Sequence, residues 1–339
     1  GATTVSLPEV PLLGVLPGTG GLTRLVDKRC VRRDRADYFS CTEEGIRGER
    51  AVEWNLVDEI IPASKFDEVI AAHALEASAQ SDRPDSEPGI VLDNLERTFS
   101  QDSLSYPNVD IVIDRKLRTA TITISAPSEK PESDLESIKR AGSQFWAFAF
   151  ARQLDDAILH LRANEDQIGT WLFKTKGAIE HVEQIDAILM EFSADWFIRE
   201  VTLYLKRVLK RLDVTSRTLI SAIEPGSCFV GTLLEVALAC DQVFMLEGEY
   251  EGNPLPPAQV SFSKMNFGPL PMVNGITRLS SRFLANPDHC DDLKSRIGER
   301  LEAEAADAAG IATFTPDDID WDDEIRISLE SRASFSPDA

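Results

Sequence analysis

Cysteine and histidine, the residue types that most often supply nucleophiles and metal ligands, form no motif in this sequence. The five cysteines are an odd number without C-x-x-C spacing, and the four histidines stand apart from one another. The spacing therefore predicts neither a disulfide framework nor a metal site. A catalytic Cys/His pair stays open as an alternative, because such partners meet only in the folded chain. The cysteines are Cys30, Cys41, Cys228, Cys240 and Cys290.

A basic cluster at residues 28–35 stands out in an acidic chain. Lys28 and Arg29 begin it, and further arginines follow directly. Lysine and arginine side chains can clamp phosphate groups, so Lys28 and Arg29 are candidate substrate-binding residues. The alternative is a solvated helix face, on which the cluster has Asp34 and Asp37 as neighbours.

Length and composition indicate a globular chain. The 339 residues suggest about two domains, and 43% hydrophobic with 27% charged residues is an ordinary globular balance. The formal net charge of −22 repels phosphate backbones and anionic lipids, so we expect no nucleic-acid or membrane partner. No window has the roughly 20 apolar residues of a membrane helix, and the first residues lack the features of a signal peptide. The sequence therefore predicts a cytoplasmic protein.

The elements that must position any site fall into two parts. Residues 1–80 begin with an apolar, glycine-rich run and end in a predicted helix with Phe66, Val69 and Ile70 on one face. Residues 81–107 are predicted to be a linker, because prolines, a glycine and acidic residues concentrate at their start. From residue 109, alternating apolar residues on both sides of the polar stretch 115–118 predict a β-hairpin that opens a second domain.

The second part of the chain alternates strands with helices. A stripe of apolar residues at about 180–213 predicts two packed helices. A strand at 218–223, a helix at 231–239 and a strand at 242–246 are predicted to follow. This alternation is typical of the α/β class.

Similar motifs occur in the same order in both parts. Residues 7–24 are LPEVPLLGVLPGTGGLTR and residues 48–57 are GERAVEWNLV, and weaker counterparts lie at 222–241, 261–271 and 309–312. These motifs resemble those of the enoyl-CoA hydratase/isomerase (crotonase) superfamily. Where the family has a glycine, this chain has Asn55, and asparagine tolerates the left-handed backbone that a glycine would adopt.

The resemblance implies an α/β fold of tandem crotonase-like modules. It makes residues 1–80 the C-terminal half of a first, incomplete module, residues 81–107 a linker, and residues 108–339 a second, degenerate module. The two helices at about 180–213 would be a helical insertion in that second module. Further sequence is expected before Gly1 and after Ala339.

The resemblance also implies where an acyl-CoA thioester would react. Crotonase-like enzymes hold the thioester oxygen between two backbone N–H groups, one of them at a helix N-terminus, where the helix dipole favours negative charge. In the first module the family pattern makes Glu9 a catalytic candidate, with an ordinary surface acid as the alternative. The glycine-rich turn would bring backbone close to the substrate, and its candidate binding residues are Gly14, Pro17, Gly18 and Gly20.

In the second module the helix-borne carboxylate position of the family is Glu235, and the helix-start donor position is Thr232. The other carboxylate position holds Lys264, which cannot act as the same base. We therefore interpret the second module as structural, shaping or covering the site of the first, and keep Glu235 as a catalytic candidate and Thr232 as a binding candidate.

The combined motifs are similar to those of ring-opening lyases within the superfamily. This similarity implies an enzyme of aerobic benzoate breakdown that opens the ring of 2,3-epoxybenzoyl-CoA with water and produces formate and 3,4-dehydroadipyl-CoA semialdehyde. It implies a homo-oligomer, and no cofactor or metal besides the CoA of the acyl-CoA substrate. The alternatives are an enoyl-CoA hydratase or isomerase, and a non-catalytic acyl-CoA-binding remnant.

Overall fold

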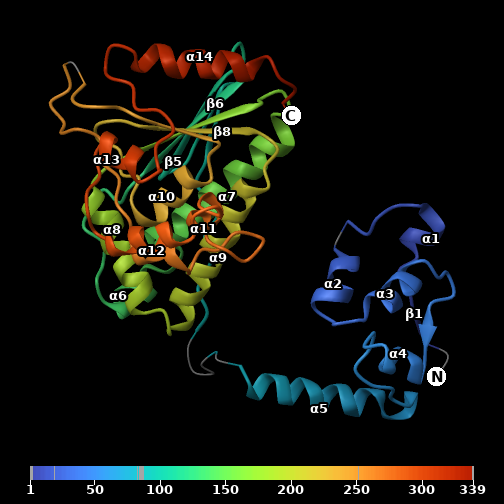
Figure 1. Ribbon diagram of the computed structural model, residues 1–339. Coiled ribbons are helices and arrows are strands. Elements are labelled where there is room, and N and C mark those ends of the chain that lie inside the picture. Colours follow the sequence, from blue (N-terminus) through green and yellow to red (C-terminus); the bar gives the residue numbers. More distant parts are fainter. Residues whose placement is uncertain (1–2, 19, 82, 84–87, 251, 338–339) are drawn as a thin grey trace. The chain divides into compact units, whose positions relative to one another are not determined.

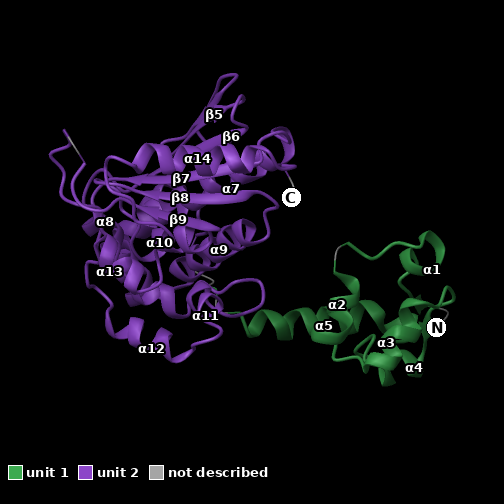
Figure 2. Ribbon diagram, turned by 45° about the horizontal axis from the view of Figure 1, so that its top comes forward, with its two compact units in different colours: residues 1–84 green, residues 85–339 purple. Residues whose placement is uncertain are grey.

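The chain forms two compact units, residues 1–84 (unit 1) and residues 85–339 (unit 2). A computed structural model describes residues 3–18, 20–81, 83, 88–250 and 252–337. Figure 1 shows the course of the chain, and Figure 2 shows the two units in different colours. The boundary falls inside the predicted linker 81–107, of which residues 82 and 84–87 lie outside the described residues. The assignment of the units to crotonase modules stays a prediction.

Unit 2 is built on a sheet whose described strands lie in the order of the sequence. The strands are β3 (Thr98–Phe99), β4 (Ser103–Ser105), β5 (Val109–Asp114), β6 (Thr119–Ser125), β7 (Thr170–Lys176), β8 (Thr218–Ile223) and β9 (Gln242–Met245). Strands β3 to β6 pair antiparallel, whereas β6 to β9 pair in parallel. Parallel neighbours need crossover connections, which helices supply here. The predicted α/β class is confirmed.

The predicted hairpin is confirmed as β5 and β6. Ile111 pairs with Ile122, and both side chains are fully buried. Val112, the next residue on β5, points to the opposite face and is 61% exposed. This alternation follows from the two-residue period of a strand, and it places one face of the hairpin in the core.

The linker prediction was wrong for its second half. Strands β3 and β4 lie within residues 98–105, and β4 pairs with β5 as part of the sheet. Ile90 also packs against the core of unit 2, and Asp93 accepts a hydrogen bond from the Ser143 hydroxyl at 2.6 Å. These segments carry few apolar residues in a regular period, so only the tertiary contacts reveal that they belong to unit 2.

Helices cover both faces of the sheet in unit 2. One face packs mainly on helices that contribute to a large apolar cluster, and the other face packs on α14 (Trp321–Ala333), as Figure 1 shows. The helices of the first face are α6 (Leu135–Ala141), α7 (Trp146–Asn164), α8 (Ile179–Glu191), α9 (Trp196–Asp213), α10 (Gly231–Leu238), α11 (Arg278–Arg282), α12 (Asp288–Ser295) and α13 (Ala303–Ala308), with 3₁₀ turns η2 (Gly142–Gln144) and η3 (Lys264–Phe267).

The two helices predicted at about 180–213 are confirmed as α8 and α9. Asp195 caps α9, since its side chain accepts hydrogen bonds from the N–H groups of Phe197 and Ile198. Both helices bury an apolar stripe, and α9 packs beside α7. That these helices are an insertion relative to a family fold stays a prediction.

Unit 1 has a small core of its own. Its described elements are β1 (Thr4–Val5), α1 (Glu9–Leu13), α2 (Gly21–Asp27), α3 (Arg33–Ser40), β2 (Ile46–Arg47), α4 (Glu49–Glu53), η1 (Ala63–Lys65) and α5 (Phe66–Ala79). Leu25, Val31 and Phe39 are among the buried residues that form the core. Asn55 has a φ of 59°, as the comparison with a family glycine predicted.

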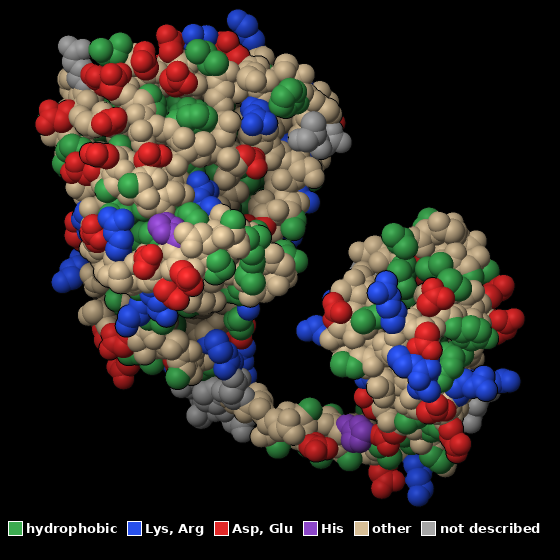
Figure 3. All heavy atoms as spheres, in the orientation of Figure 1, with side chains coloured by type: hydrophobic (Ala, Val, Ile, Leu, Met, Phe, Trp, Pro, Cys, Tyr) green, Lys and Arg blue, Asp and Glu red, His purple; other side chains and the backbone are tan. Residues whose placement is uncertain are grey.

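Charged side chains are scattered over the face of unit 2 that Figure 3 shows, with acidic and basic groups interspersed. Among the described helices, none is long and apolar enough to span a membrane.

Replacing Ile122 by alanine is expected to destabilise unit 2. The change leaves a cavity in the middle of the sheet, which typically lowers the free energy of unfolding by about 2–5 kcal/mol. Urea unfolding followed by near-UV circular dichroism measures the loss. Val112→Ala, on the exposed face of β5, is the matched control and should cost less than about 1 kcal/mol. Equal losses for the two variants would contradict the packing described for the sheet.

Candidate functional site

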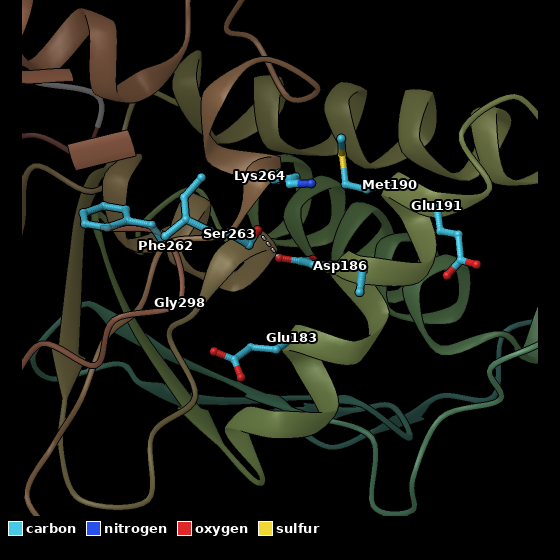
Figure 4. A pocket seen from close by; sticks show the side chains of 10 residues that line it. Glu183, Asp186, Met190, Glu191, Phe262, Ser263, Lys264 and Gly298 are labelled. Atoms are coloured by element: carbon cyan, nitrogen blue, oxygen red, sulfur yellow. Dashed lines mark hydrogen bonds between the residues drawn. The ribbon is translucent and has the colours of Figure 1, made fainter. Parts of the chain in front are cut away.

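A buried carboxylate on α8 lies against the N-terminus of α10. The Asp186 side chain is 2% exposed and accepts hydrogen bonds from two residues of other elements. The Thr232 N–H donates to its Oδ2 at 2.9 Å, and the Thr232 hydroxyl donates to its Oδ1 at 2.5 Å. The Ser263 hydroxyl donates to Oδ2 at 2.6 Å. Figure 4 shows Asp186 and Ser263 pointing toward one another.

A cavity of about 410 Å³ lies beside this carboxylate. Residues of α8 and the chain segments around residues 262–264 and 297–298 line it. Its walls combine apolar surface from Met190 and Phe262 with polar groups from Asp186, Ser263 and Lys264. Another acid of the lining, Glu183, is paired with Arg300 at 2.8 Å. The cavity is therefore mainly apolar and has a few polar groups in its wall.

Burial controls the charge of Asp186. The pKa of its carboxyl is raised to about 6, mainly by loss of solvation and to a smaller extent by the nearby negative charge of Glu183. The hydrogen bonds from Ser263 and Thr232 act in the opposite direction because they stabilise the charged form. Near neutral pH the group is therefore mainly an anion held by neutral donors and by the positive end of the α10 dipole.

The structure gives Thr232 a different role from the predicted one. Thr232 is the second residue of α10, as expected for a helix-start donor. Its N–H, which the resemblance assigned to a thioester oxygen, already donates to Asp186. Its side chain is 1% exposed. An anion of the chain itself thus occupies the position that was predicted for substrate.

Glu235 is also held in a fixed arrangement. It is 1% exposed, and its Oε2 accepts a hydrogen bond from Arg278 Nη1 at 2.6 Å, while Asn266 Nδ2 donates to Oε1 at 2.7 Å. Arg278 also binds Asp213 with both Nε and Nη2. Burial raises the pKa of Glu235, and the Arg278 guanidinium opposes this shift. With both oxygens engaged, Glu235 has the geometry of a core ion pair, and its predicted catalytic role finds no support here.

In unit 1, Glu9 is the first residue of α1, and the predicted turn follows the helix directly. Gly14 ends α1 with a φ of 64°, and Gly20 precedes α2 with a φ of 81°. The Gly20 N–H donates to the Pro17 carbonyl at 3.0 Å, which closes the turn around Gly18. The positive φ values explain why glycine occupies positions 14 and 20.

One carboxylate oxygen of Glu9 is unusual. Glu9 Oε2 is buried, and among the described residues it has no hydrogen-bond partner. An unpaired buried oxygen of this kind is costly, and such atoms are often found where a ligand or water belongs. Unit 1 also has a cavity of about 630 Å³, whose wall includes Val5, Arg47 and Phe66 but not Glu9. The structure thus places Glu9 at the turn but not at this cavity.

The basic cluster is largely neutralised by neighbours. Arg29 Nη1 forms an ion pair with Asp58 at 2.8 Å, and Arg29 Nε donates to the Asn55 carbonyl at 2.7 Å. Arg35 likewise pairs with Glu53. Lys28 is exposed at the end of α2. These contacts favour the alternative of a solvated surface over a phosphate clamp that includes Arg29.

Sequence reasoning missed Asp186, Ser263 and Arg278. Asp186 lies four residues after Val182 and three before Leu189, both fully buried, so it is an acid on the apolar face of a predicted helix. That position was a usable signal, because a buried acid requires partners. The partners themselves are 46 and 77 residues away in the sequence, and no local spacing could identify them.

The chain is similar over nearly its whole length to one characterised enzyme type. It is 46% identical over 337 residues to the benzoyl-CoA-dihydrodiol lyase of Aromatoleum evansii, which covers 99% of this chain and 60% of that enzyme. Over 82 residues it is 35% identical to the fatty acid oxidation complex subunit alpha of Idiomarina loihiensis, covering 24% of this chain and 11% of that subunit. No family model matches the chain. The resemblance drawn from the motifs is confirmed at the level of sequence.

Solved structures with similar chain paths are distant in sequence. An enoyl-CoA hydratase of Geobacillus kaustophilus is 16% identical, with a TM-score of 0.45, covering 72% of this chain and 79% of that one. An enoyl-CoA hydratase/carnitine racemase of Magnetospirillum magneticum is 17% identical, with a TM-score of 0.47, covering 69% of this chain and 77% of that one.

Replacing Arg278 by methionine is expected to destabilise unit 2 strongly. The variant leaves the carboxylates of Glu235 and Asp213 buried without their cation, which typically costs about 3–5 kcal/mol near neutral pH. The loss should shrink as the pH falls towards 5, because the unpaired carboxylates take up protons. Urea unfolding at both pH values measures it, with the surface variant Arg326→Met as a control that leaves stability unchanged. A pH-independent loss would contradict this account.

Asp186→Asn is expected to change the pH dependence of stability. The pKa of Asp186 is higher in the folded chain than its ordinary value of 3.8, so the folded state binds this proton more tightly. Ionisation of Asp186 therefore lowers the free energy of unfolding of the wild type as the pH rises from about 4 to about 6. The asparagine variant lacks this loss, and its stability relative to wild type should rise by about 1–3 kcal/mol across that range. Urea unfolding at pH 4.5 and 7.5 tests this; parallel curves would refute the assignment.

Proposed function

We propose that this chain belongs to an enzyme of the benzoyl-CoA-dihydrodiol lyase type, which opens the ring of 2,3-epoxybenzoyl-CoA. The observation that carries the proposal is the 46% identity over 337 residues to the enzyme of that name. The chain spans 60% of the length of that relative. In the proposed reaction two waters enter, a C–C bond breaks, and formate leaves with 3,4-dehydroadipyl-CoA semialdehyde as the other product.

We assign the reacting centre to unit 1. Ring opening by water requires a carboxylate that can accept or deliver protons, and Glu9 has a buried oxygen without a partner among the described residues. The left-handed glycines Gly14 and Gly20 have no side-chain atoms, so a thioester could approach the backbone of the turn closely at these two positions. CoA enters only as part of the substrate.

The proposal assigns no reacting group to unit 2. The two groups that the resemblance assigned to chemistry in this unit, the Thr232 N–H and the Glu235 carboxylate, are both engaged by other residues of unit 2. Lys264 lies at the second carboxylate position and cannot replace a carboxylate as base. These contacts favour a structural role for unit 2 in the proposed enzyme.

Formate production from 2,3-epoxybenzoyl-CoA tests the proposed reaction. The assay is run on the 339-residue chain and on a form extended to the length of the Aromatoleum enzyme. The proposal predicts one formate for each semialdehyde thioester formed by at least the extended form. Hydration of crotonyl-CoA without formate would support a hydratase instead, and tight benzoyl-CoA binding without turnover would support a binding remnant.

Glu9→Gln is expected to reduce turnover while sparing the binding of CoA esters. Removing a general acid or base typically costs about 100-fold or more in kcat, whereas glutamine keeps the size and most contacts of the side chain. The measurement uses whichever form of the protein produces formate, and it compares kcat with the Kd of benzoyl-CoA. Glu68→Gln, on the exposed surface of α5, is the matched control. Unchanged kcat in the Glu9 variant would remove Glu9 from the mechanism.

A further inference from the structure

The N-terminus of α10 is an anion site that the chain fills by itself. Every hydrogen bond described for the Asp186 carboxylate comes from a neutral donor, either the Thr232 backbone or the hydroxyls of Thr232 and Ser263. At 2% exposure the group has almost no contact with solvent. N–H groups and the dipole at a helix N-terminus stabilise negative charge. The eight-residue α10 therefore stabilises the Asp186 carboxylate in the place of a cation.

The backbone beside the carboxylate is shaped to admit it. Gly231 has a φ of 48°, a conformation that side-chain-bearing residues rarely adopt. A Cβ atom at this position would lie 1.7 Å from Asp186 Oδ2 and 2.7 Å from Ser263 Oγ. The carboxylate therefore fits against α10 only because residue 231 has no side chain. Two independent features thus mark the position of the carboxylate: the hydrogen-bond donors around it, and the absence of a Cβ atom at residue 231.

We propose that Asp186 is a permanent internal ligand of this site, and that removing its carboxylate creates a binding site for small carboxylate anions such as formate. Replacing Asp186 by alanine removes one carbon and two oxygen atoms, which are those of the carboxylate. Formate consists of the same three heavy atoms. The neighbouring cavity of about 410 Å³, lined by Asp186 and Ser263, provides room for the anion to enter. The inference does not depend on the proposed function, because it concerns stability and anion binding only.

Rescue of Asp186→Ala by formate tests the proposal. Thermal unfolding of the whole chain is followed at pH 7.5 in sodium formate and in sodium chloride of equal ionic strength. In chloride the alanine variant should unfold well below the wild type. Formate should raise its midpoint by about 2 °C or more, saturably, relative to chloride. Wild type and Asp186→Asn are the matched controls, since both keep the volume filled, and neither should distinguish formate from chloride.

A second measurement applies if the alanine variant does not fold in chloride. Refolding from urea is then compared in the two salts by near-UV circular dichroism, and the proposal predicts that formate restores the signal. Equal stability of the alanine variant and wild type in chloride would overturn the proposal. So would equal midpoints or refolding yields of the alanine variant in the two salts, or a formate effect of the same size in all three proteins.

Discussion

A buried carboxylate, Asp186, that has no cationic partner among the described residues is the constraint on which the arrangement of unit 2 depends. Asp186 stays charged near neutral pH only if its lone pairs are satisfied, and the donors come from the start of α10 and from Ser263. These contacts tie α8, α10 and the segment before η3 to one point. They also require a glycine at position 231, because a Cβ atom there would collide with the carboxylate. The same carboxylate forms part of the wall of the neighbouring cavity.

The same constraint decides which residues remain available for chemistry. In unit 2, Arg278 binds Glu235 and Asp213, and Asp186 binds Thr232, so the groups that resemble catalytic ones already have partners. In unit 1, Glu9 retains a buried oxygen without a partner among the described residues. The contrast is the reason for our proposal that the reacting centre lies in unit 1 and that unit 2 has a structural role. Identity to a lyase over 337 residues supports the reaction itself.

Local patterns could predict most elements but few of their contacts. The hairpin and the helices α8 and α9 follow from residues close in sequence, and the structure confirms them. The left-handed backbone of Asn55, which comparison with the family glycine suggested, is also confirmed. The short strands β3 and β4 have no clear period, so they were assigned to the linker. The bond from Ser263 to Asp186 joins residues 77 positions apart, and only folding brings them together.

A crystal structure of the active protein with bound benzoyl-CoA tests most directly which unit holds the thioester. Our account predicts the thioester beside Glu9 and the turn at Gly14 and Gly20, with Asp186 still accepting the hydrogen bond of the Thr232 N–H. A thioester oxygen bound to the Thr232 N–H, with the Asp186 carboxylate displaced, would contradict the account.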